Sequence, residues 1–361
     1  MNPEQTYIIA EAGVNHNGSL DMAIELIDIA VNAQANAVKF QTFRAEALVS
    51  RAAPRADYQN KNTGDDESQY EMLKKLELDE NQHRTLIDYA KSKTIEFLST
   101  PFDLESLYLL SKTFNIRKIK VPSGEITNAP FLLEIAKNAD QIILSTGMST
   151  LSDIEAALGV IAFGFTEVGD EFPNLVKFSK AFASERGKRE LRKRVTLLHA
   201  TTEYPAPLQD INLNAMHTMA SAFGLPVGYS DHSEGVHIPV AAVAKGACLI
   251  EKHFTLDKNL PGPDHKASLE PQELKQMIKL IREIEVAMGD GLKVPASSEW
   301  KNQKIARKSL HANRSIEADE VFSMENLTVK RPGDGIPPIQ YWEYLGKKSN
   351  RSYSTDEMIR N

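Results

Sequence analysis

The chain has 361 residues, of which 42% are hydrophobic and 25% are charged, a composition that is ordinary for a globular protein with a large core. A formal net charge of −7, without a long run of Lys and Arg, argues against nucleic acid or a membrane surface as the main partner. The one dense basic segment, Arg186 to Arg194, contains Glu190 and follows Glu185, so we interpret it as a solvated helix face.

Cys248 is the only cysteine and cannot form an internal disulfide. Its apolar neighbours suggest a buried strand residue, and the lack of a cysteine pair suggests a reducing, cytoplasmic setting. The chain shows neither a basic leader before a long apolar stretch nor eighteen uninterrupted apolar residues. We therefore expect a protein that is neither secreted nor membrane-spanning.

Short apolar runs alternate with segments of helical periodicity. One such segment follows Ser19, which is a good helix N-cap, and the sequence AEAGVNHNG before it is not a glycine-rich phosphate loop of a doubly wound sheet. The alternation predicts parallel βα units, and eight of them close into a (β/α)8 barrel. The eight candidate strands are residues 7–10, 37–40, 95–98, 119–121, 141–144, 195–198, 226–228 and 248–250.

Polar and ionisable residues follow almost every candidate strand. Barrel enzymes place their chemistry at the carboxyl ends of the strands, and such a ring of side chains would be costly to bury without partners. The sequence therefore predicts a ligand-binding mouth. Its candidate residues include Glu11, Lys39, Gln41, Thr100, Lys120, Ser123, Glu125, Ser145, His199, Ser230, His232, Glu251 and His253.

Two histidines give the strongest local signal, because His232 in GYSDHS and His253 in EKHFTLD follow successive strands. Two neutral imidazoles, completed by water and substrate oxygens, suit a divalent metal such as Mn²⁺, with Mg²⁺ or Co²⁺ as alternatives and with Asp231 or Glu251 as outer ligands. The role of His199 is left open. Four others are interpreted as ordinary hydrogen-bonding residues: His83, His217, His237 and His311.

Lysines and hydroxyls form a second group at the expected mouth. Lys39 and Lys120 lie within otherwise apolar strands, which is unusual for lysine. Lysines and hydroxyls that converge on one spot make an anion site, with phosphate as the obvious ligand. The group comprises Lys39, Thr100, Lys120, Ser123, Ser145 and Ser230.

Three carboxylates, Glu11, Glu125 and Asp264, are candidates for holding substrate hydroxyls or moving protons. Asp264 lies in PGPD, which is equally typical of a turn.

The pattern changes after an amphipathic helix expected at residues 271–288. GDGLKVPASSEWKNQKIARKS is polar and interrupted by Gly and Pro, which is typical of a linker, and short β-like pieces follow it. We expect a barrel at residues 1–290, a linker at 291–304 and a small domain at 305–361. Residues 163–194 look like an insertion between the fifth helix and the sixth strand, either a surface excursion or a lid or oligomer contact.

Nine motifs in order carry a family resemblance: IIAEAGVNHNGS, VKFQTF, FLSTPFD, KVPSGEITN, ILSTGMS, EYPAP, GYSDHS, EKHFT and LPGPDHKASL. They resemble the sialic acid synthase family, which includes N-acetylneuraminate, legionaminate and pseudaminate synthases, and LTVKRPGDGI resembles its antifreeze-like (SAF) domain. The resemblance covers nearly the whole chain except the 163–194 insertion. It implies a TIM barrel and a small β-clip domain that covers the partner's barrel mouth in a domain-swapped homodimer.

The resemblance also implies an activity and a set of roles. Phosphoenolpyruvate would be joined to an open-chain N-acetylated hexosamine, either N-acetylmannosamine or 2,4-diacetamido-2,4,6-trideoxymannose, with C–O cleavage and release of phosphate. His232 and His253 would bind the metal, and the lysine and hydroxyl group would bind phosphoenolpyruvate. Thr202 stands where some relatives carry an asparagine. The sugar contacts would be Glu11, Gln41, Tyr204, Asp264 and, from the partner subunit's small domain, the counterpart of Arg331.

Two other functions are compatible with the residues. A class I keto-acid aldolase or lyase on the same barrel would use Lys39 or Lys120 as a Schiff base. The second alternative is a non-catalytic sugar binder with the same fold. In such a protein the paired histidines, both lysines and Glu11 would have no chemistry to perform.

Overall fold

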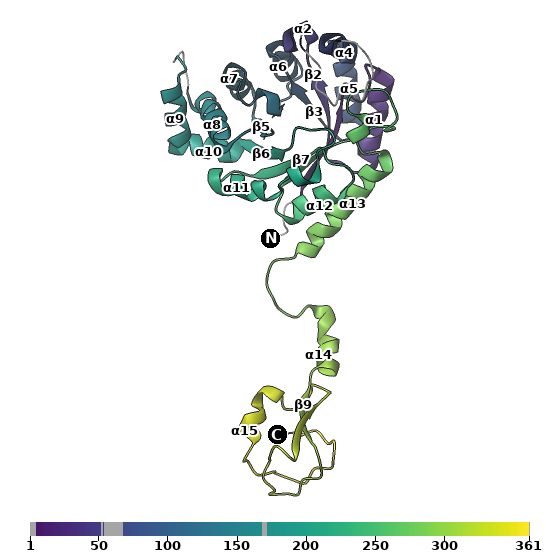
Figure 1. The fold of residues 1–361 in the computed structure, drawn as a ribbon, viewed down its shortest axis with the longest axis vertical. Helices are drawn as coiled ribbons and strands as arrows, with labels where there is room; N and C mark the ends of the chain where they lie inside the picture. The colour runs from purple at the N-terminus through teal and green to yellow at the C-terminus, as the bar shows by residue number, and fades with distance from the viewer. Residues whose placement is uncertain (1–4, 52, 54–67, 168–171, 361) are drawn as a thin grey trace. The chain divides into compact units, whose positions relative to one another are not determined.

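The computed structural model describes residues 5–51, 53, 68–167 and 172–360. The chain divides into two compact units, residues 1–289 and 290–361 (Figure 1). Each unit has its own hydrophobic core. None of the helices in the described ranges is long and apolar enough to cross a membrane.

Eight parallel strands form the centre of the first unit, in the order β3-β2-β1-β8-β7-β6-β5-β4. The first and last strands pair with each other, and β3 and β4 are also in contact, so the sheet curls into the predicted (β/α)8 barrel. The strands are β1 Tyr7–Gly13, β2 Ala37–Thr42, β3 Glu96–Pro101, β4 Lys118–Val121, β5 Gln141–Ser145, β6 Val195–Ala200, β7 Val227–Asp231 and β8 Leu249–His253.

All eight strands were predicted, but most of them extend further at the carboxyl end than the sequence indicated. Strand β7, expected to stop at residue 228, continues to Asp231, and β8 continues to His253. The polar residues that were taken to follow the strands are therefore within them or directly after them. Since their backbone groups stay in the sheet, their side chains are held at fixed levels of the barrel mouth.

Strand register places several of these polar residues side by side. Glu11 on β1 pairs with Lys39 on β2 and with His253 on β8, while Ser230 on β7 pairs with Glu251 on β8. Because residues opposite each other in parallel strands share one level of the sheet, this register brings acids, a base and an imidazole together.

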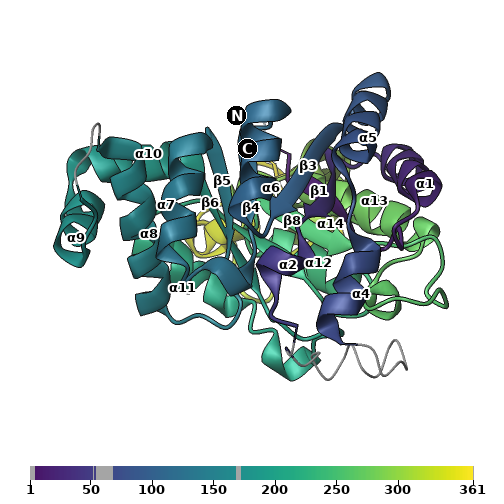
Figure 2. The same ribbon diagram turned by 90° about the horizontal axis from the view of Figure 1, so that it is seen from above.

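Helices surround the strands (Figure 2). As predicted, Ser19 caps the first helix by accepting a hydrogen bond from the Met22 backbone N–H at 3.4 Å, and the amphipathic helix at 271–288 is present. The helices of this unit are α1 Leu20–Asn32, α2 Ala45–Leu48, α4 Gln69–Leu76, α5 Glu80–Ser92, α6 Leu104–Tyr108, α7 Ala129–Asn138, α8 Leu151–Thr166, α9 Leu175–Ala183, α10 Glu185–Arg194, α11 Asn214–Phe223, α12 His237–Ala244 and α13 Pro271–Met288.

The expected insertion contains two helices that lie against the outside of the barrel. Helix α8 continues to Thr166, three residues past residue 163, where the insertion was expected to begin. Helices α9 and α10 pack on α8 (Figure 2). Phe163 contacts Phe178 edge-on, with ring centroids 5.3 Å apart. The basic segment forms the exposed part of α10, as predicted. Residues 168–171 of the insertion lie outside the described residues.

Cys248 corrects one prediction, because it is exposed. Its backbone N–H bonds to Val227 and its carbonyl accepts from Tyr7, so the residue precedes β8 at the amino-terminal edge of the barrel. Apolar neighbours in sequence suggested burial, but the barrel core begins one residue later, at Leu249.

The second unit is small and has an apolar centre of its own. Strands β9 Ser309–Ala312 and β10 Leu327–Lys330 pair antiparallel. Its buried core comprises Leu310, Ala312, Ile316, Phe322, Leu327, Ile336, Tyr353 and Ile359. The segment expected to be a linker is exposed and contains helix α14 Trp300–Ala306, and α15 Tyr341–Tyr344 follows β10.

Gly228→Ala tests how tightly the barrel wall is packed. A methyl group at this position would lie 2.5 Å from the Leu249 carbonyl oxygen and 2.8 Å from Leu198 Cδ2, and overpacking of this kind typically costs about 1–3 kcal/mol. We expect a lower free energy of unfolding by urea titration. Gly124→Ala, where an added methyl group has no neighbour within 4 Å, is the matched control; equal loss in both variants would contradict this packing.

Candidate active site

A pocket opens at the carboxyl ends of the barrel strands, where the sequence predicted the ligand-binding mouth. Of the fourteen residues given a catalytic, substrate or metal role, twelve line it: Glu11, Lys39, Gln41, Thr100, Lys120, Ser123, Ser145, Tyr204, Ser230, His232, His253 and Asp264. Glu251 lines it too, whereas His199 does not. Two of the fourteen lie elsewhere. Glu125 lies outside the lining and accepts a hydrogen bond from Asn128 Nδ2 at 2.7 Å, and Arg331 belongs to the second unit, so their assignments stay predictions.

Two lysines and two glutamates form a buried cluster in the pocket. Lys39 Nζ lies 2.5 Å from Glu11 Oε2 and 3.4 Å from Glu251 Oε2, and Lys120 Nζ lies 3.0 Å from Glu251 Oε1. None of the four residues is more than 7% exposed. We call Glu11, Lys39, Lys120 and Glu251 the lysine–carboxylate cluster. Two positive and two negative charges balance within it, which is what allows them to remain buried.

Hydroxyl groups add hydrogen bonds to the cluster. Lys39 Nζ donates to Thr100 Oγ1 at 3.0 Å, and Ser230 Oγ donates to Glu251 Oε1 at 2.8 Å. Beside it, Ser123 Oγ donates to Ser145 Oγ at 2.9 Å. The six residues of the predicted lysine and hydroxyl group therefore line one pocket, as an anion site requires.

The pKa values in the cluster follow from burial and charge together. Burial raises the pKa of Glu11 to about 7, against the opposing effect of Lys39. Burial alone would also raise the pKa of Glu251, but Lys120 and Lys39 hold it well below its usual range. Burial lowers the pKa of Lys120. Glu251 is thus the fixed negative charge of the cluster, whereas Glu11 can take up or release a proton near neutral pH.

Glu251 was not assigned to the anion site from the sequence. The EKH motif suggested an outer metal ligand, but its carboxylate bridges Lys120, Lys39 and Ser230 instead. One signal was available: Glu251 lies two residues before His253, and alternation along a strand places both on the same face.

The two predicted metal ligands lie together, with the ring centroids of His232 and His253 5.8 Å apart. His232 Nδ1 donates to the Thr201 carbonyl at 2.6 Å, so its Nε2 carries the lone pair, beside the Tyr204 hydroxyl at 3.1 Å. His253 Nδ1 is buried and has no hydrogen-bond partner. A ring oriented by a carbonyl and a buried nitrogen without a partner both fit metal ligation.

Burial keeps both imidazoles neutral. It lowers the pKa of His232 to about 4 and that of His253 well below its usual value. Within the described ranges no three His, Cys, Asp or Glu side chains form a complete metal-binding group. A divalent ion here would therefore take two protein nitrogens and leave its other positions to water and substrate oxygens.

A second buried ion pair supports the imidazoles from behind. Lys252 Nζ lies 2.6 Å from Asp231 Oδ2, and both side chains are fully buried. Asp231 also accepts from the Ser233 backbone N–H at 3.0 Å and from Tyr229 at 3.1 Å. Because Asp231 precedes His232 and Lys252 precedes His253, the pair fixes the strand ends that carry both rings. The role of Asp231 as an outer metal ligand stays a prediction.

Two further pocket residues are buried among few polar partners. Burial raises the pKa of Asp264 to about 6, so this carboxyl group can also carry a proton near neutral pH. Thr202 Oγ1 is buried without a hydrogen-bond partner.

The histidines interpreted as structural include His83 and His311, and both bond to protein groups. His199, whose role was left open, also bonds to a protein group, the Ile211 carbonyl, at 2.6 Å.

Comparisons with known proteins identify the family of the chain. The NeuB family model matches residues 26–293 and the SAF domain model matches residues 307–361. The chain belongs to the NeuB family. It is 52% identical to the N,N'-diacetyllegionaminic acid synthase of Campylobacter jejuni, over 99% of both chains, and 42% identical to that of Legionella pneumophila, over 96% of this chain and 91% of the relative.

Solved structures give the same result for the fold. A crystal structure of the N-acetylneuraminic acid synthetase of Leptospira borgpetersenii in complex with citrate matches with a TM-score of 0.66 and 32% identity, covering 83% of this chain and 90% of that one. The expected NeuB-family activity, a phosphoenolpyruvate-dependent nonulosonic acid synthase with a TIM barrel and a SAF domain, is thereby confirmed.

Lys252→Met tests the ion pair behind the imidazoles. It leaves Asp231 as an uncompensated buried charge, which costs about 3–5 kcal/mol of unfolding free energy. We expect this loss in denaturant titrations, together with weaker Mn²⁺ binding by calorimetry. Lys245→Met, at an exposed lysine, is the control. Unchanged stability and Mn²⁺ affinity in Lys252→Met would contradict the role.

Glu11→Gln tests the raised pKa of Glu11. The folded protein holds this proton more tightly than the unfolded chain, so the carboxyl group contributes stability below its unfolded pKa that is lost as pH rises towards about 7. We expect the melting temperature of Glu11→Gln, relative to the unmodified protein, to increase between pH 5 and pH 8. A difference independent of pH would show that the pKa of Glu11 is not raised.

Proposed function

We propose that the chain makes N,N'-diacetyllegionaminic acid by condensing phosphoenolpyruvate with 2,4-diacetamido-2,4,6-trideoxymannose. The observation that supports this choice of sugar is sequence identity, which is higher to legionaminic acid synthases than to synthases of other nonulosonic acids. Identity is 52% and 42% to two N,N'-diacetyllegionaminic acid synthases, 32% to a pseudaminic acid synthase of Campylobacter jejuni and 31% to the human N-acetylneuraminate-9-phosphate synthase.

The polar surface of the pocket supports phosphoenolpyruvate as the deeper ligand. Its charges match the ammonium groups of Lys39 and Lys120, and its phosphate oxygens match the hydroxyls of Ser123 and Ser145. Binding of this anion adds negative charge beside Glu11, which favours protonation of that carboxyl group. C3 of phosphoenolpyruvate then attacks the sugar aldehyde carbon, water adds to C2, and the C2–O bond breaks as phosphate leaves.

His232 and His253 would hold the divalent metal, with Mn²⁺ as the proposed ion. When bound, such an ion polarises a carbonyl oxygen and lowers the pKa of water. The residues of the chain have distinct tasks around it. Lys39 and Lys120 neutralise the departing phosphate, whereas Glu11 and Asp264 are the groups able to hold or move a proton near neutral pH.

An aldolase that uses a lysine Schiff base is the alternative. The lowered pKa of Lys120 would suit it, but each lysine is paired with a carboxylate within 3.0 Å, which favours the unreactive ammonium form. Borohydride reduction in the presence of pyruvate distinguishes the two. We expect no covalent adduct by mass spectrometry, and a stable adduct on Lys39 or Lys120 would favour the aldolase.

Three further expectations remain proposals. The SAF domain of one subunit would cover the barrel mouth of its partner in a domain-swapped homodimer, Arg331 would contact the N-acetyl group of the sugar, and the enzyme would work in the cytoplasm. The match of the SAF domain model to residues 307–361 supports the first two.

Phosphate release tests the proposed reaction. With phosphoenolpyruvate and Mn²⁺, the protein should release phosphate with 2,4-diacetamido-2,4,6-trideoxymannose and more slowly with N-acetylmannosamine. His232→Ala and His253→Ala should each lower kcat at least a hundredfold, because each removes a metal ligand, and chelation of the metal should do the same.

His217→Ala, at an exposed histidine of α11, is the matched control and should retain full activity. No phosphate release with any N-acetylated hexosamine would reject the proposed function, and full activity after removal of both imidazoles would reject the metal site.

A further inference from the structure

One side of the active-site pocket is hydrophobic. Its residues Val14, Met72 and Leu76 pack with Phe43 into a small cluster separate from the barrel core, with Leu48, Leu73 and Phe102 partly buried against it. We call the pocket-lining residues of this side the apolar wall. The apolar wall consists of Val14, Leu48, Val49, Met72, Leu73, Leu76 and Phe102.

The apolar wall comes from one part of the chain. Val14 follows β1, Phe102 follows β3, and the other five residues lie in the connection between β2 and β3. In the strand order of the barrel, β1 lies between β2 and β8. Strands β2 and β3 are therefore on the other side of β1 from β8 and β7, the strands that carry the imidazoles. Because the apolar wall and the imidazoles line the same pocket, a sugar whose aldehyde lies at the imidazoles has room to place its other end against the wall.

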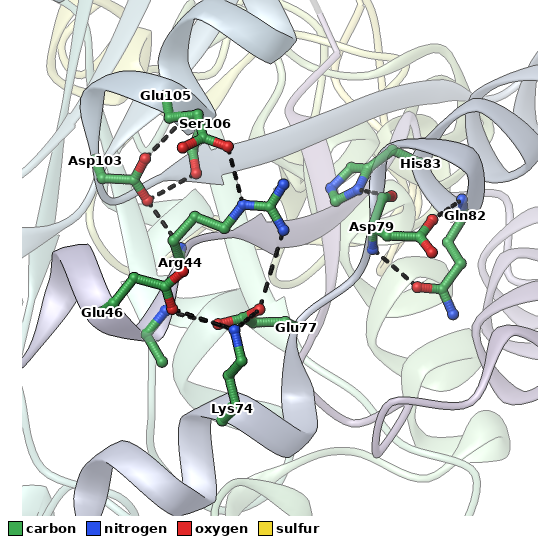
Figure 3. Close-up of polar contacts among 11 residues, drawn as sticks. Arg44, Glu46, Lys74, Glu77, Asp79, Gln82, His83, Asp103, Glu105 and Ser106 are labelled. Carbon is green, nitrogen blue, oxygen red and sulfur yellow. Dashed lines mark hydrogen bonds and ion pairs between the residues drawn. The ribbon is translucent and has the colours of Figure 1, made fainter.

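Polar contacts link α2 and α4, which carry most of the apolar wall (Figure 3). Lys74 on α4 bonds to Glu46 on α2 at 3.1 Å and to Glu77 at 2.9 Å. Glu77, whose side chain is only 11% exposed, accepts from the Ala45 backbone N–H at 2.7 Å. These contacts join the two helices to each other.

Arg44 anchors the same connection to the start of α6, which follows β3. Its backbone N–H donates to Asp103 Oδ2 at 2.9 Å, and its Nε donates to Glu105 at 3.1 Å (Figure 3). Ser68 begins α4 with a capping box to Glu71. The start of the connection is thus tied to a neighbouring segment, and the start of α4 is stabilised by its own cap.

We propose that the apolar wall selects the sugar, by packing against the C6 methyl group and the methyl of the C4 acetamido group. This inference rests on the proposed function and assigns its specificity. N-acetylmannosamine carries hydroxyl groups at C4 and C6, and placing them against the wall would remove water without supplying hydrogen-bond partners. A methyl group in the same place gains hydrophobic burial.

Gln69 adds a polar feature at the edge of the wall. It lies in the first turn of α4, is half-buried and lines the pocket. A carboxamide can donate and accept at once, which is the pattern that an acetamido group complements. The wall would hold the methyl of the C4 substituent while Gln69 bonds to its amide.

Leu73→Asn and Leu48→Asn test the proposal, because both leucines are half-buried and line the pocket. The measured quantity is the ratio of kcat/KM for 2,4-diacetamido-2,4,6-trideoxymannose to kcat/KM for N-acetylmannosamine. We expect each variant to lower the ratio about tenfold. Leu73→Met, which keeps the surface apolar, should retain it, and so should Leu208→Asn at a leucine that is 61% exposed and outside the pocket.

The melting temperature, and the phosphoenolpyruvate affinity measured by calorimetry, identify variants that have lost the fold. The ratio of the two kcat/KM values is then interpreted only for variants that are folded. If the unmodified protein prefers the diacetamido sugar and both asparagine variants bind phosphoenolpyruvate but keep the ratio, the apolar wall does not select the sugar. If the unmodified protein itself shows no preference for the diacetamido sugar, the proposed sugar is wrong and the inference falls with it.

Discussion

The burial of four charges at the mouth of the barrel is the constraint on which the site depends. Lys39 and Lys120 could not remain almost inaccessible to solvent without Glu11 and Glu251 beside them. Strand register supplies that pairing, since Glu11 lies directly opposite Lys39. Balanced charges keep the cluster stable without a ligand, and they leave the ammonium groups in place to receive an anionic substrate.

The same constraint separates the tasks of the two glutamates. Glu251 faces both lysines and stays ionised, so it is a structural charge that orients them. Glu11 contacts one lysine and is buried deeply enough to hold a proton near neutral pH. An enzyme that adds a carbon nucleophile to an aldehyde and then releases phosphate requires both a fixed anion-binding surface and a group that can exchange protons.

Around this cluster the pocket has two different sides. The imidazoles of His232 and His253 are held by the buried Asp231–Lys252 pair, which suits a reacting centre that must not move. The apolar wall is built mostly on the β2–β3 connection, in which polar contacts link α2 and α4. Barrel enzymes change specificity through such connections while the strands keep the chemistry, and this division is visible here in separate elements.

The sequence by itself determined the strand alternation, the eight-unit barrel, the two imidazoles on neighbouring strands and the lysines in apolar runs, because each of these depends on local periodicity and on the rule that parallel strands end at one edge. Only the tertiary structure decided which carboxylate pairs with which lysine. The sequence offered Glu251 only as an alternative to Asp231 for an outer metal ligand, whereas in the folded barrel its carboxylate contacts Lys120 and Lys39. The exposure of Cys248 and the apolar wall were also beyond the sequence, since both depend on where a segment lies against distant residues rather than on its own pattern.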